Sequence, residues 1–361
     1  MTYNLKINRI LKYLQNRGWT INDYSDFAYK ITLSLRGENF DIIIPKDERI
    51  RDYDFRIEQL LKSLSAIEDR EIKTIKDDIE NIGFDVVKFR FIFEKYNGAM
   101  PLNDFTGAVE KIYDIVKFEA CSELNPQSQY TNTYEEARQL LSHCEVPHTE
   151  KGSYIINLKV PLGETYVGEI KEGDEYLRFL GRNTIVRTLK GIDEAKRIDL
   201  TNEDQFKRTY DKKLNKNTCK AIKELISSIE EATVEIDTRW EATKPIEIEV
   251  PRAPKLSRED ALLFERMEGY LTKIPEDQPM EIQGKLMELK RGKENYKEQT
   301  IIVSDINLHR NITVTLRAED YDRACEMYTR IGSVKIKGIL KKLNNKWILE
   351  DYESLGIQSA L

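Results

Sequence analysis

The last third of the chain carries the most regular pattern in the sequence. Its segments are, in order, EIQGKLMELK (281–290), QTIIVSDI (299–306), NITVTLR (311–317), AEDYDRACEMYTRI (318–331), SVKIKGILKKL (333–343) and KWILEDY (346–352). In NITVTLR, the apolar residues Ile312, Val314 and Leu316 alternate with polar ones, as in a strand that buries one face. Because the fourth segment has helical spacing, the pattern predicts three strands, a helix and two strands.

This order of elements is that of an OB-fold, a small five-stranded Greek-key barrel. Gly284 and Gly338 fall inside predicted strands. A small closed barrel has to bend sharply at such points, and glycine otherwise only weakens a strand. We therefore expect an OB-like barrel over residues 276–361, with its helix between the third and fourth strands.

The rest of the chain has the pattern of an α+β protein. Residues 1–100 predict an N-terminal α+β unit with a first helix, a hairpin formed by YKITLSL and FDIIIP, and a strand DVVKFRFIF. Residues 101–250 predict a mixed middle unit that contains the strands SYIINLKVPL and TVEIDTRW. Residues 251–275 predict a proline-containing linker and a helix, where Ser257 and Asp260 resemble a capping box.

Composition narrows the class of protein without giving its function. The chain has 361 residues, of which 33% are charged, and a net charge of -6, so any nucleic-acid site has to be local. The first residues do not resemble a signal peptide, and no apolar run is long enough to span a membrane. The four cysteines are widely separated, and we expect them to be reduced in a cytoplasmic protein.

Over nearly its whole length the chain resembles a family of bacterial proteins with an N-terminal α+β part and an OB-like C-terminal domain. The segments that carry the resemblance are GSYIINLKVPL (152–162), KNTCKAIKELI (216–226), VTLRAEDYDRACEMY (314–328), VKIKGIL (334–340) and KWILED (346–351). These motifs are structural. The resemblance therefore implies a bacterial origin and the C-terminal barrel, and it implies no activity.

The first candidate site is a basic surface on the barrel that binds single-stranded nucleic acid. Its residues are Lys285, Lys290, Arg291, Lys293, Tyr296, Arg317, Lys335 and Lys337. Cations can follow phosphates, and a tyrosine ring can stack on a base. However, acidic residues such as Glu288 and Glu350 lie between the lysines, and NITVTLR presents Asn and Thr where stacking aromatic rings would be expected. This composition favours contact with a protein over contact with nucleic acid.

Two further clusters are candidate catalytic or metal sites. His143, Cys144 and His148 are close in sequence, with Cys121 upstream, and both residue types bind zinc. No second close pair completes a tetrahedral site, so we expect no metal there and read these residues as structural.

Glu169 and Lys171 flank Ile170 at the end of a predicted strand, TYVGEIK. Such a pair is half of a metal-dependent nuclease site, in which carboxylates hold Mg²⁺ and the lysine orients water. The upstream aspartate that this site needs is missing, so a charged strand end is the simpler interpretation.

The sequence contains no P-loop, dinucleotide-binding, zinc-protease or serine-hydrolase motif, and we expect no cofactor. We therefore expect a non-enzymatic binding or assembly protein, whose barrel contacts a protein partner or a second copy of the chain. An accessory subunit in bacterial defence against phage is one setting for such a protein. Single-strand binding by the barrel and a nuclease that uses Glu169 and Lys171 are the alternatives.

Overall fold

The structure is a computed structural model of the chain. It describes all residues except 1–4, 36, 94–99, 148–153, 164–174, 199, 202–205, 207–213, 229–231, 247, 252–253, 273–279, 292–298, 307, 309, 328–330, 344–345 and 360–361. The chain forms two compact units. The first unit contains Met1–Val86 and Thr238–Glu249, and the second contains Val87–Asp237 and Val250–Leu361.

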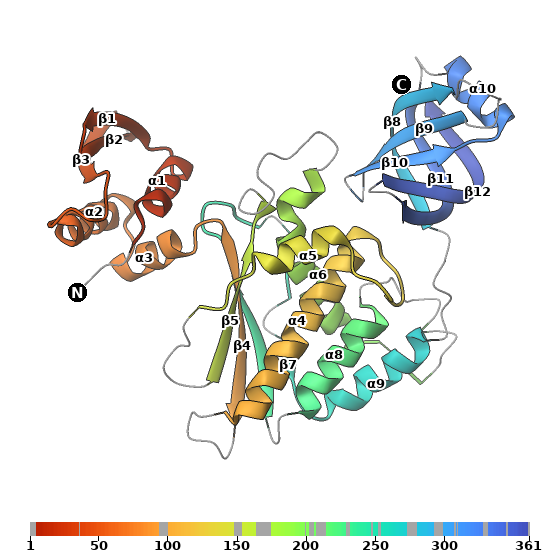
Figure 1. The fold of residues 1–361 in the computed structure, drawn as a ribbon, viewed down its shortest axis with the longest axis horizontal. Helices are drawn as coiled ribbons and strands as arrows, with labels where there is room; N and C mark the ends of the chain where they lie inside the picture. Colours follow the sequence, from red (N-terminus) through yellow and green to blue (C-terminus); the bar gives the residue numbers. More distant parts are fainter. Residues whose placement is uncertain are drawn as a thin grey trace. The chain divides into compact units, whose positions relative to one another are not determined.

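The first unit is a three-stranded sheet with helices (Figure 1). Its elements are α1 (Ile7–Asn16), β1 (Thr20–Ser25), β2 (Ala28–Leu35), β3 (Glu38–Pro45), α2 (Tyr53–Glu68) and α3 (Ile72–Glu80). The strands follow the order β1-β2-β3 and pair antiparallel, which confirms the predicted hairpin. Gly37, with a φ of 84°, provides the left-handed conformation that the hairpin turn requires.

The two faces of this sheet differ because side chains alternate along each strand. Ile31 pairs with Ile42 and Tyr29 with Ile44 on the face that joins the hydrophobic core with α1, α2 and α3. On the opposite face, the Thr32 hydroxyl donates to Asp41 over 2.7 Å. One face therefore holds the unit together, and the other is exposed.

A cluster of ion pairs attaches the late segment, Thr238–Glu249, to the first unit. Arg239 donates to Asp78 over 2.5 Å and to Asp77 over 3.1 Å. Arg70 donates to the second carboxylate oxygen of Asp78. The Asp78 residue is 6% exposed, so both guanidinium groups meet a nearly buried carboxylate.

The second unit begins with a four-stranded sheet of order β5-β4-β6-β7. Its strands are β4 (Phe84–Phe93), β5 (Tyr154–Pro161), β6 (Ala232–Arg239) and β7 (Lys255–Leu256). Helices lie on one side of this sheet in Figure 1, and α4 packs against α6 and α8. These helices are α4 (Leu102–Leu124), α5 (Glu135–Ser142), η2 (Glu175–Phe179), α6 (Leu180–Ala195), α8 (Lys216–Ser227) and α9 (Asp260–Leu271).

The C-terminal part of this unit is a closed five-stranded barrel, as the sequence predicts. Its elements are β8 (Met280–Arg291), β9 (Gln299–Asp305), β10 (Arg310–Thr315), α10 (Ala318–Met327), β11 (Ile331–Leu343) and β12 (Lys346–Ser359). The strands close in the order β10-β12-β11-β8-β9, and β10 runs parallel to β12.

Both predicted strand glycines lie where backbones approach closely. A Cβ atom on Gly284 would lie 1.9 Å from the carbonyl oxygen of Ser304, and one on Gly338 would lie 2.7 Å from that of Glu350. Gly338 also marks a shift in the β11–β12 register between Lys337 and Ile339. A side chain at either position would therefore push two barrel strands apart. Among the described helices, none has both the length and the apolar composition that crossing a membrane requires.

Candidate functional site

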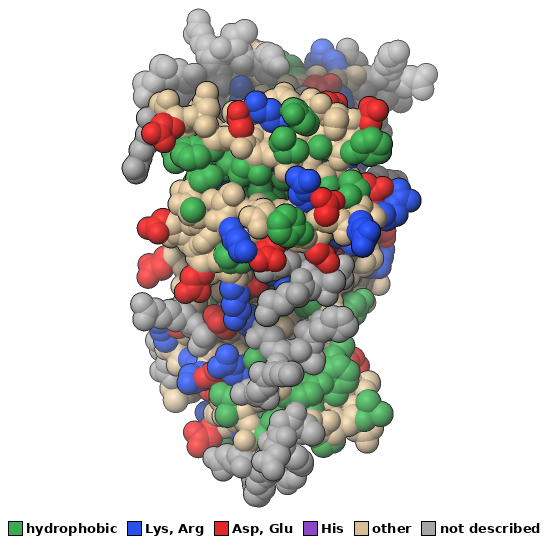
Figure 2. Space-filling view, turned by 90° about the vertical axis from the view of Figure 1, so that its left-hand side faces the viewer, with side chains coloured by type: hydrophobic (Ala, Val, Ile, Leu, Met, Phe, Trp, Pro, Cys, Tyr) green, Lys and Arg blue, Asp and Glu red, His purple; other side chains and the backbone are tan. Residues whose placement is uncertain are grey.

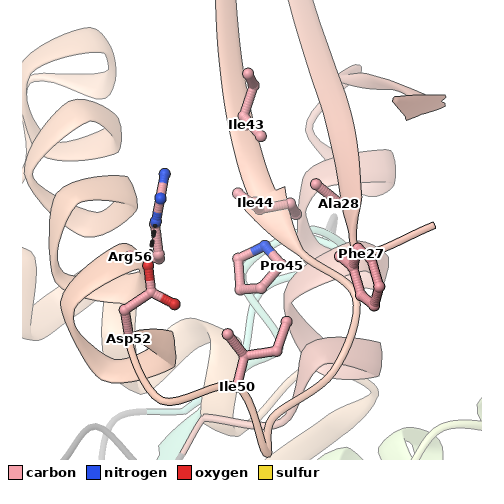
Figure 3. A pocket seen from close by; sticks show the side chains of 8 residues that line it. All are labelled: Phe27, Ala28, Ile43, Ile44, Pro45, Ile50, Asp52 and Arg56. Carbon is pink, nitrogen blue, oxygen red and sulfur yellow. Dashed lines mark hydrogen bonds and ion pairs between the residues drawn. The ribbon is translucent and has the colours of Figure 1, made fainter. Parts of the chain in front are cut away.

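An apolar pocket opens on the first unit, between the end of β3 and the start of α2 (Figure 3). Its volume is about 170 Å³, and it is lined by Phe27, Ala28, Ile43, Ile44, Pro45, Ile50, Asp52 and Arg56. Phe27 is 73% exposed and Ile43 is 43% exposed, although both are large apolar residues. The pocket therefore offers an open apolar surface, with Asp52 and Arg56 as the charged residues of its lining.

Local structure holds the walls of this pocket in place. Ala28 pairs with Pro45, and the amide of Lys46 donates to the carbonyl of Phe27 over 2.9 Å, so the β1–β2 turn lies beside the end of β3. At the rim, Arg56 donates to Asp52 over 2.9 Å, and this contact lowers the pKa of Asp52. At neutral pH the rim therefore carries an ion pair beside an apolar floor.

Strand β3 lies at the edge of its sheet and pairs only with β2. No backbone hydrogen bond from the described residues reaches its outer edge, and Phe40 and Ile42 are only half-buried. The strand contains Glu38 and Asp41 and no lysine or arginine. Asp41 contacts Lys30 of β2 at 2.9 Å, so Glu38 supplies the remaining acidic charge of this strand. An edge of this kind can pair with a further strand.

The basic residues predicted on the barrel are mostly paired with carboxylates. Lys335 contacts Glu281 at 2.7 Å, and Lys337 contacts Glu353 at 3.1 Å. Similar ion pairs join Lys290 to Glu288 at 3.0 Å and Arg291 to Asp322 at 3.4 Å. Figure 2 presents instead the left-hand side of Figure 1, where α2 and β3 are labelled, and shows basic and acidic side chains interspersed with apolar ones there.

The four remaining residues of that prediction have different surroundings. The guanidinium of Arg317 lies 5.0 Å from the ring centroid of Tyr352, and its backbone amide donates to the Tyr352 hydroxyl over 2.9 Å. Lys285 is exposed on β8. Lys293 and Tyr296 lie outside the described residues. The described residues thus contain no continuous row of uncompensated cations, and the predicted nucleic-acid surface stays a prediction.

The outward face of β9 and β10 is uncharged. It presents Thr300, Ile302, Ser304, Asn311, Thr313 and Thr315, which pair across the two strands. OB-folds that bind oligonucleotides or oligosaccharides use the face of their second and third strands. Here that face offers hydroxyl and amide groups, but neither cations for phosphates nor aromatic rings for bases.

The candidate metal-binding residues that the structure describes lie in unreactive surroundings. Burial raises the pKa of the Cys121 thiol to about 11 and that of Cys144 to about 12, so both thiols stay protonated at neutral pH. His143 Nδ1 lies 2.9 Å from the carbonyl of Gln139. Among the described residues no group of three or more His, Cys, Asp or Glu side chains is placed to hold a metal ion.

His148 and the sequence Glu169 to Lys171 lie outside the described residues. The nuclease hypothesis therefore stays a prediction.

Within the second unit, the start of β10 contacts the end of α4. Arg310 is almost fully buried and donates to the carbonyls of Leu124 and, over 3.2 Å, of Glu123. A cation at the C-terminus of a helix is favourable because unpaired carbonyls there carry partial negative charge. The Arg310 guanidinium also lies 4.5 Å from the Trp347 ring centroid, which is 5.5 Å from that of Tyr134.

A second pocket, which we name the junction pocket, lies beside this contact. It has a volume of about 240 Å³ and is lined by Asn125, Gln127, Tyr130, Thr131, Asn132, Tyr134, Leu340 and Lys341. The first six residues belong to the loop after α4, and the last two belong to β11. Residues 125–134, NPQSQYTNTY, are a polar segment of the sequence, but nothing in that segment indicates that it meets the barrel.

A buried carboxylate on α4 is the most perturbed acid of the second unit's described residues. Glu119 is fully buried, and burial raises its pKa to about 7, although Arg187 opposes this shift. Asn215 donates to its Oε1 over 2.9 Å, and Arg187 Nε lies 3.4 Å from its Oε2. The side chain of Asn215 also accepts a hydrogen bond from the Thr218 amide and in this way caps the N-terminus of α8.

The chain matches no family model, no curated protein and no solved structure. Its function therefore has to be inferred from the contacts, burial and charge of the residues described above.

Proposed function

We propose that the protein acts by binding another protein, as an adaptor or assembly component, and that the pocket beside Phe27 is a contact point. The exposure of Phe27, 73% of the residue, beside an open apolar pocket carries this proposal. Single exposed apolar residues are common, but an aromatic side chain next to an apolar hollow is typical of a protein-binding surface. Burying both under a partner removes apolar area from water.

The proposed occupant is an extended segment of the partner that contains an aliphatic or aromatic side chain and a neighbouring basic residue. A pocket of about 170 Å³ suits one such side chain. The free outer edge of β3 offers backbone groups to an added strand, which would also cover Phe40 and Ile42. Glu38 on the same strand favours a basic residue in that segment, whereas Asp41 already contacts Lys30 of β2 at 2.9 Å.

The barrel supports the same function as a second surface. We infer an OB-like fold because, counted along the chain, its strands close in the order 1-2-3-5-4, the third and fifth are parallel, and α10 follows the third. Ion pairs neutralise most of its described lysines, and its β9–β10 face is polar and uncharged. A surface of this composition suits a protein partner better than a phosphate backbone.

The test is to pan a random peptide library against the full-length protein and to measure the enriched peptides by fluorescence anisotropy. We expect sequences with an apolar anchor and a basic neighbour, and micromolar affinity. Phe27→Ser and Ile43→Ser should each weaken binding at least tenfold, because each removes apolar surface at the pocket.

Phe55→Ser is the matched control. Phe55 is 61% exposed on α2 but does not line the pocket, so its loss should leave peptide affinity unchanged. Peptides that bind equally to wild type and to Phe27→Ser would contradict the proposal. Sedimentation velocity covers the other occupant: self-association that Phe27→Ser abolishes would mean that a second copy of the chain, and not a partner segment, fills the pocket.

A further inference from the structure

The polar segment after α4, residues 125–134, contacts two strands of the barrel, and we name it the junction segment. Asn125 Nδ2 donates to the Tyr134 hydroxyl over 3.1 Å and lies 3.5 Å from the carbonyl of Leu340 on β11. The centroid of the Tyr134 ring lies 5.5 Å from that of Trp347 on β12. The junction segment therefore lies where α4 ends and the barrel begins.

Hydrogen bonds connect the junction segment to the buried carboxyl of Glu119. The Tyr130 hydroxyl donates to the carbonyl of Asn125 over 2.5 Å and lies 3.2 Å from the Ser122 hydroxyl. Asn215 in turn donates to Ser122 over 3.0 Å and to Glu119 over 2.9 Å. The side chains of this series are nearly or fully buried. The series is therefore shielded from water between Glu119 and the segment that meets the barrel.

The N-terminus of α8 joins the same network. The Asn217 side chain accepts from the Tyr130 amide over 2.8 Å and donates to the Tyr130 carbonyl over 3.0 Å. The amide of Lys216 donates to the carbonyl of Ser128 over 2.7 Å. These two residues directly follow Asn215, the cap of α8. A displacement of Asn215 is therefore passed to the backbone of the junction segment as well as to Ser122.

The network has few donors for a charged Glu119. Its Oε2 atom is buried and has no hydrogen-bond partner among the described residues, and Arg187 Nε lies 3.4 Å away. The amide of Asn215 is already shared among Glu119 and three other acceptors within 3.2 Å. Because a carboxylate forms stronger hydrogen bonds than a neutral acceptor, ionised Glu119 competes with Ser122 for this amide. Ionisation therefore weakens the contacts that hold Tyr130, or requires water to enter.

The groups around Glu119 make it the acid that titrates near neutral pH. The charged and titratable groups that face it or its neighbours are Glu123 of α4, Arg187 of α6, Cys219 of α8, Glu268 of α9 and Arg310 of β10. The arginines stay charged, and burial raises the pKa of the Cys219 thiol well above its usual value, so this thiol stays neutral. Burial raises the pKa of Glu119 to about 7, although Arg187 opposes the shift.

We propose that the junction segment is a pH-sensitive element, which stays packed on α4 and the barrel while Glu119 is neutral and opens when Glu119 ionises. A carboxyl whose pKa is raised in the packed state stabilises that state at low pH, and this contribution is lost as pH rises through the raised value. From pH 4.5 to about 7, each pH unit should raise the ratio of open to packed segments by up to about tenfold. Above pH 7 the ratio should level off.

The Cys121 thiol reports on this opening. It is fully buried and accepts a hydrogen bond from the backbone amide of Tyr134, so we expect its alkylation to require movement of the junction segment. The experiment treats the full-length protein with iodoacetamide between pH 5.5 and 8 and measures the rate at each cysteine by mass spectrometry. Dividing the wild-type rate by that of Glu119→Gln removes the pH dependence of the reagent. We expect this ratio to rise at least tenfold for Cys121 up to pH 7.5 and then stay level.

Two tyrosine variants test the route from Glu119 to the segment. Tyr130→Phe keeps the ring but removes the hydroxyl between Ser122 and Asn125. Measured against its own Glu119→Gln double variant, it should reduce the rise to less than threefold. Tyr113→Phe is the matched control, because Tyr113 is an exposed tyrosine of the same helix, and it should keep the full rise.

Three results would overturn the proposal. The first is a Cys121 ratio that does not change with pH, and the second is an unchanged rise in Tyr130→Phe. The third is alkylation of Cys219, which is buried in α8, at the same rate as Cys121, because the whole second unit would then be unfolding. Phe27→Ser should leave the Cys121 rates unchanged, so this proposal and the peptide-binding proposal can fail separately.

Discussion

The two units each bury a carboxylate, but they surround it differently. Asp78 in the first unit is 6% exposed and is bonded by two guanidinium groups, from Arg70 and Arg239. Glu119 in the second unit is fully buried and faces one, Arg187, at 3.4 Å, together with the neutral amide of Asn215. Burial penalises the charged form in both places, so the number and alignment of the cations decide how that penalty is offset.

The difference separates two uses of a buried acid. The two arginines of Asp78 come from segments far apart in the chain, so the carboxylate joins the late segment to the first unit. Glu119 has less compensation, and its pKa of about 7 leaves it shared between charged and neutral forms near neutral pH. Asp78 therefore holds two segments of the first unit together, whereas Glu119 is a group whose charge changes with pH.

The largest loss of stability that we expect comes from removing the carboxylate of Asp78. Asp78→Ala removes the carboxylate that the two guanidinium groups share. Arg70 keeps Glu68 and Arg239 keeps Asp77, so we expect a loss of about 3 kcal/mol, the lower end of the cost of removing one member of a buried ion pair. Urea unfolding monitored by circular dichroism measures this loss. Asp77→Ala is the control, because Asp77 is more exposed and contacts Arg239 only, so its effect should stay below about 1 kcal/mol. Equal losses in both variants would contradict this role.

A smaller effect should come from Glu119, whose titration makes the free energy of unfolding depend on pH. Its pKa rises from 4.5 in the unfolded chain to about 7 in the folded protein, so folding favours its protonated form. Its stabilising contribution is complete below pH 4.5 and is lost as pH rises to about 7. At about 1.4 kcal/mol per pH unit, the free energy of unfolding relative to Glu119→Gln should fall by about 3 kcal/mol over this range and then stay level.

The measurement for Glu119 is a series of urea titrations of wild type and variant between pH 4.5 and 8. Glu119→Gln keeps an acceptor for Asn215, so the fold should persist. Glu110→Gln, which removes an exposed carboxyl from the same helix, should leave the wild-type profile in place. A Glu119→Gln profile parallel to that of wild type would show that this carboxyl does not titrate on folding.

The smallest effect should come from the exposed ion pairs of the barrel. Lys335→Ala and Lys337→Ala break pairs with Glu281 and Glu353 whose members are about half exposed, so each should cost less than about 1 kcal/mol. For the same reason we expect single-strand affinity of wild type to be no tighter than about 10⁻⁶ M in physiological salt. Anisotropy with a labelled oligonucleotide checks this, and nanomolar binding lost in the double variant would support the single-strand hypothesis instead.

The barrel and the hairpin could be predicted because their residues are periodic and their turns are local. The alternation of NITVTLR appears as β10, and the strand glycines lie at close backbone approaches. Strand β1 could not be predicted, because its sequence TINDYS is polar and largely exposed and forms a strand by pairing with β2. In such a strand the partner supplies what local propensity lacks.

The candidate sites were harder to predict because they are assembled from distant segments. The pocket beside Phe27 needs the β1–β2 turn, the end of β3 and the start of α2. Lys335 and its partner Glu281 are far apart in sequence, so the neutralising pairs of the barrel appear only when β11 lies beside β8. Residue types alone indicate basic side chains on the barrel and a polar loop. Which of these side chains are neutralised, and which line a pocket, depends on which strands and loops lie side by side.

The ion pairs of Asp78 also determine when the first unit can be completed during protein synthesis. About 150 residues separate the two segments of the first unit, Met1–Val86 and Thr238–Glu249. At roughly 5–20 residues per second, a ribosome needs on the order of 10–30 s to travel from one to the other. Throughout that interval the growing chain has made Asp78 and Arg70 but not Arg239. The first unit to emerge is thus among the last to be completed, and a chain released before Thr238 leaves it unfinished.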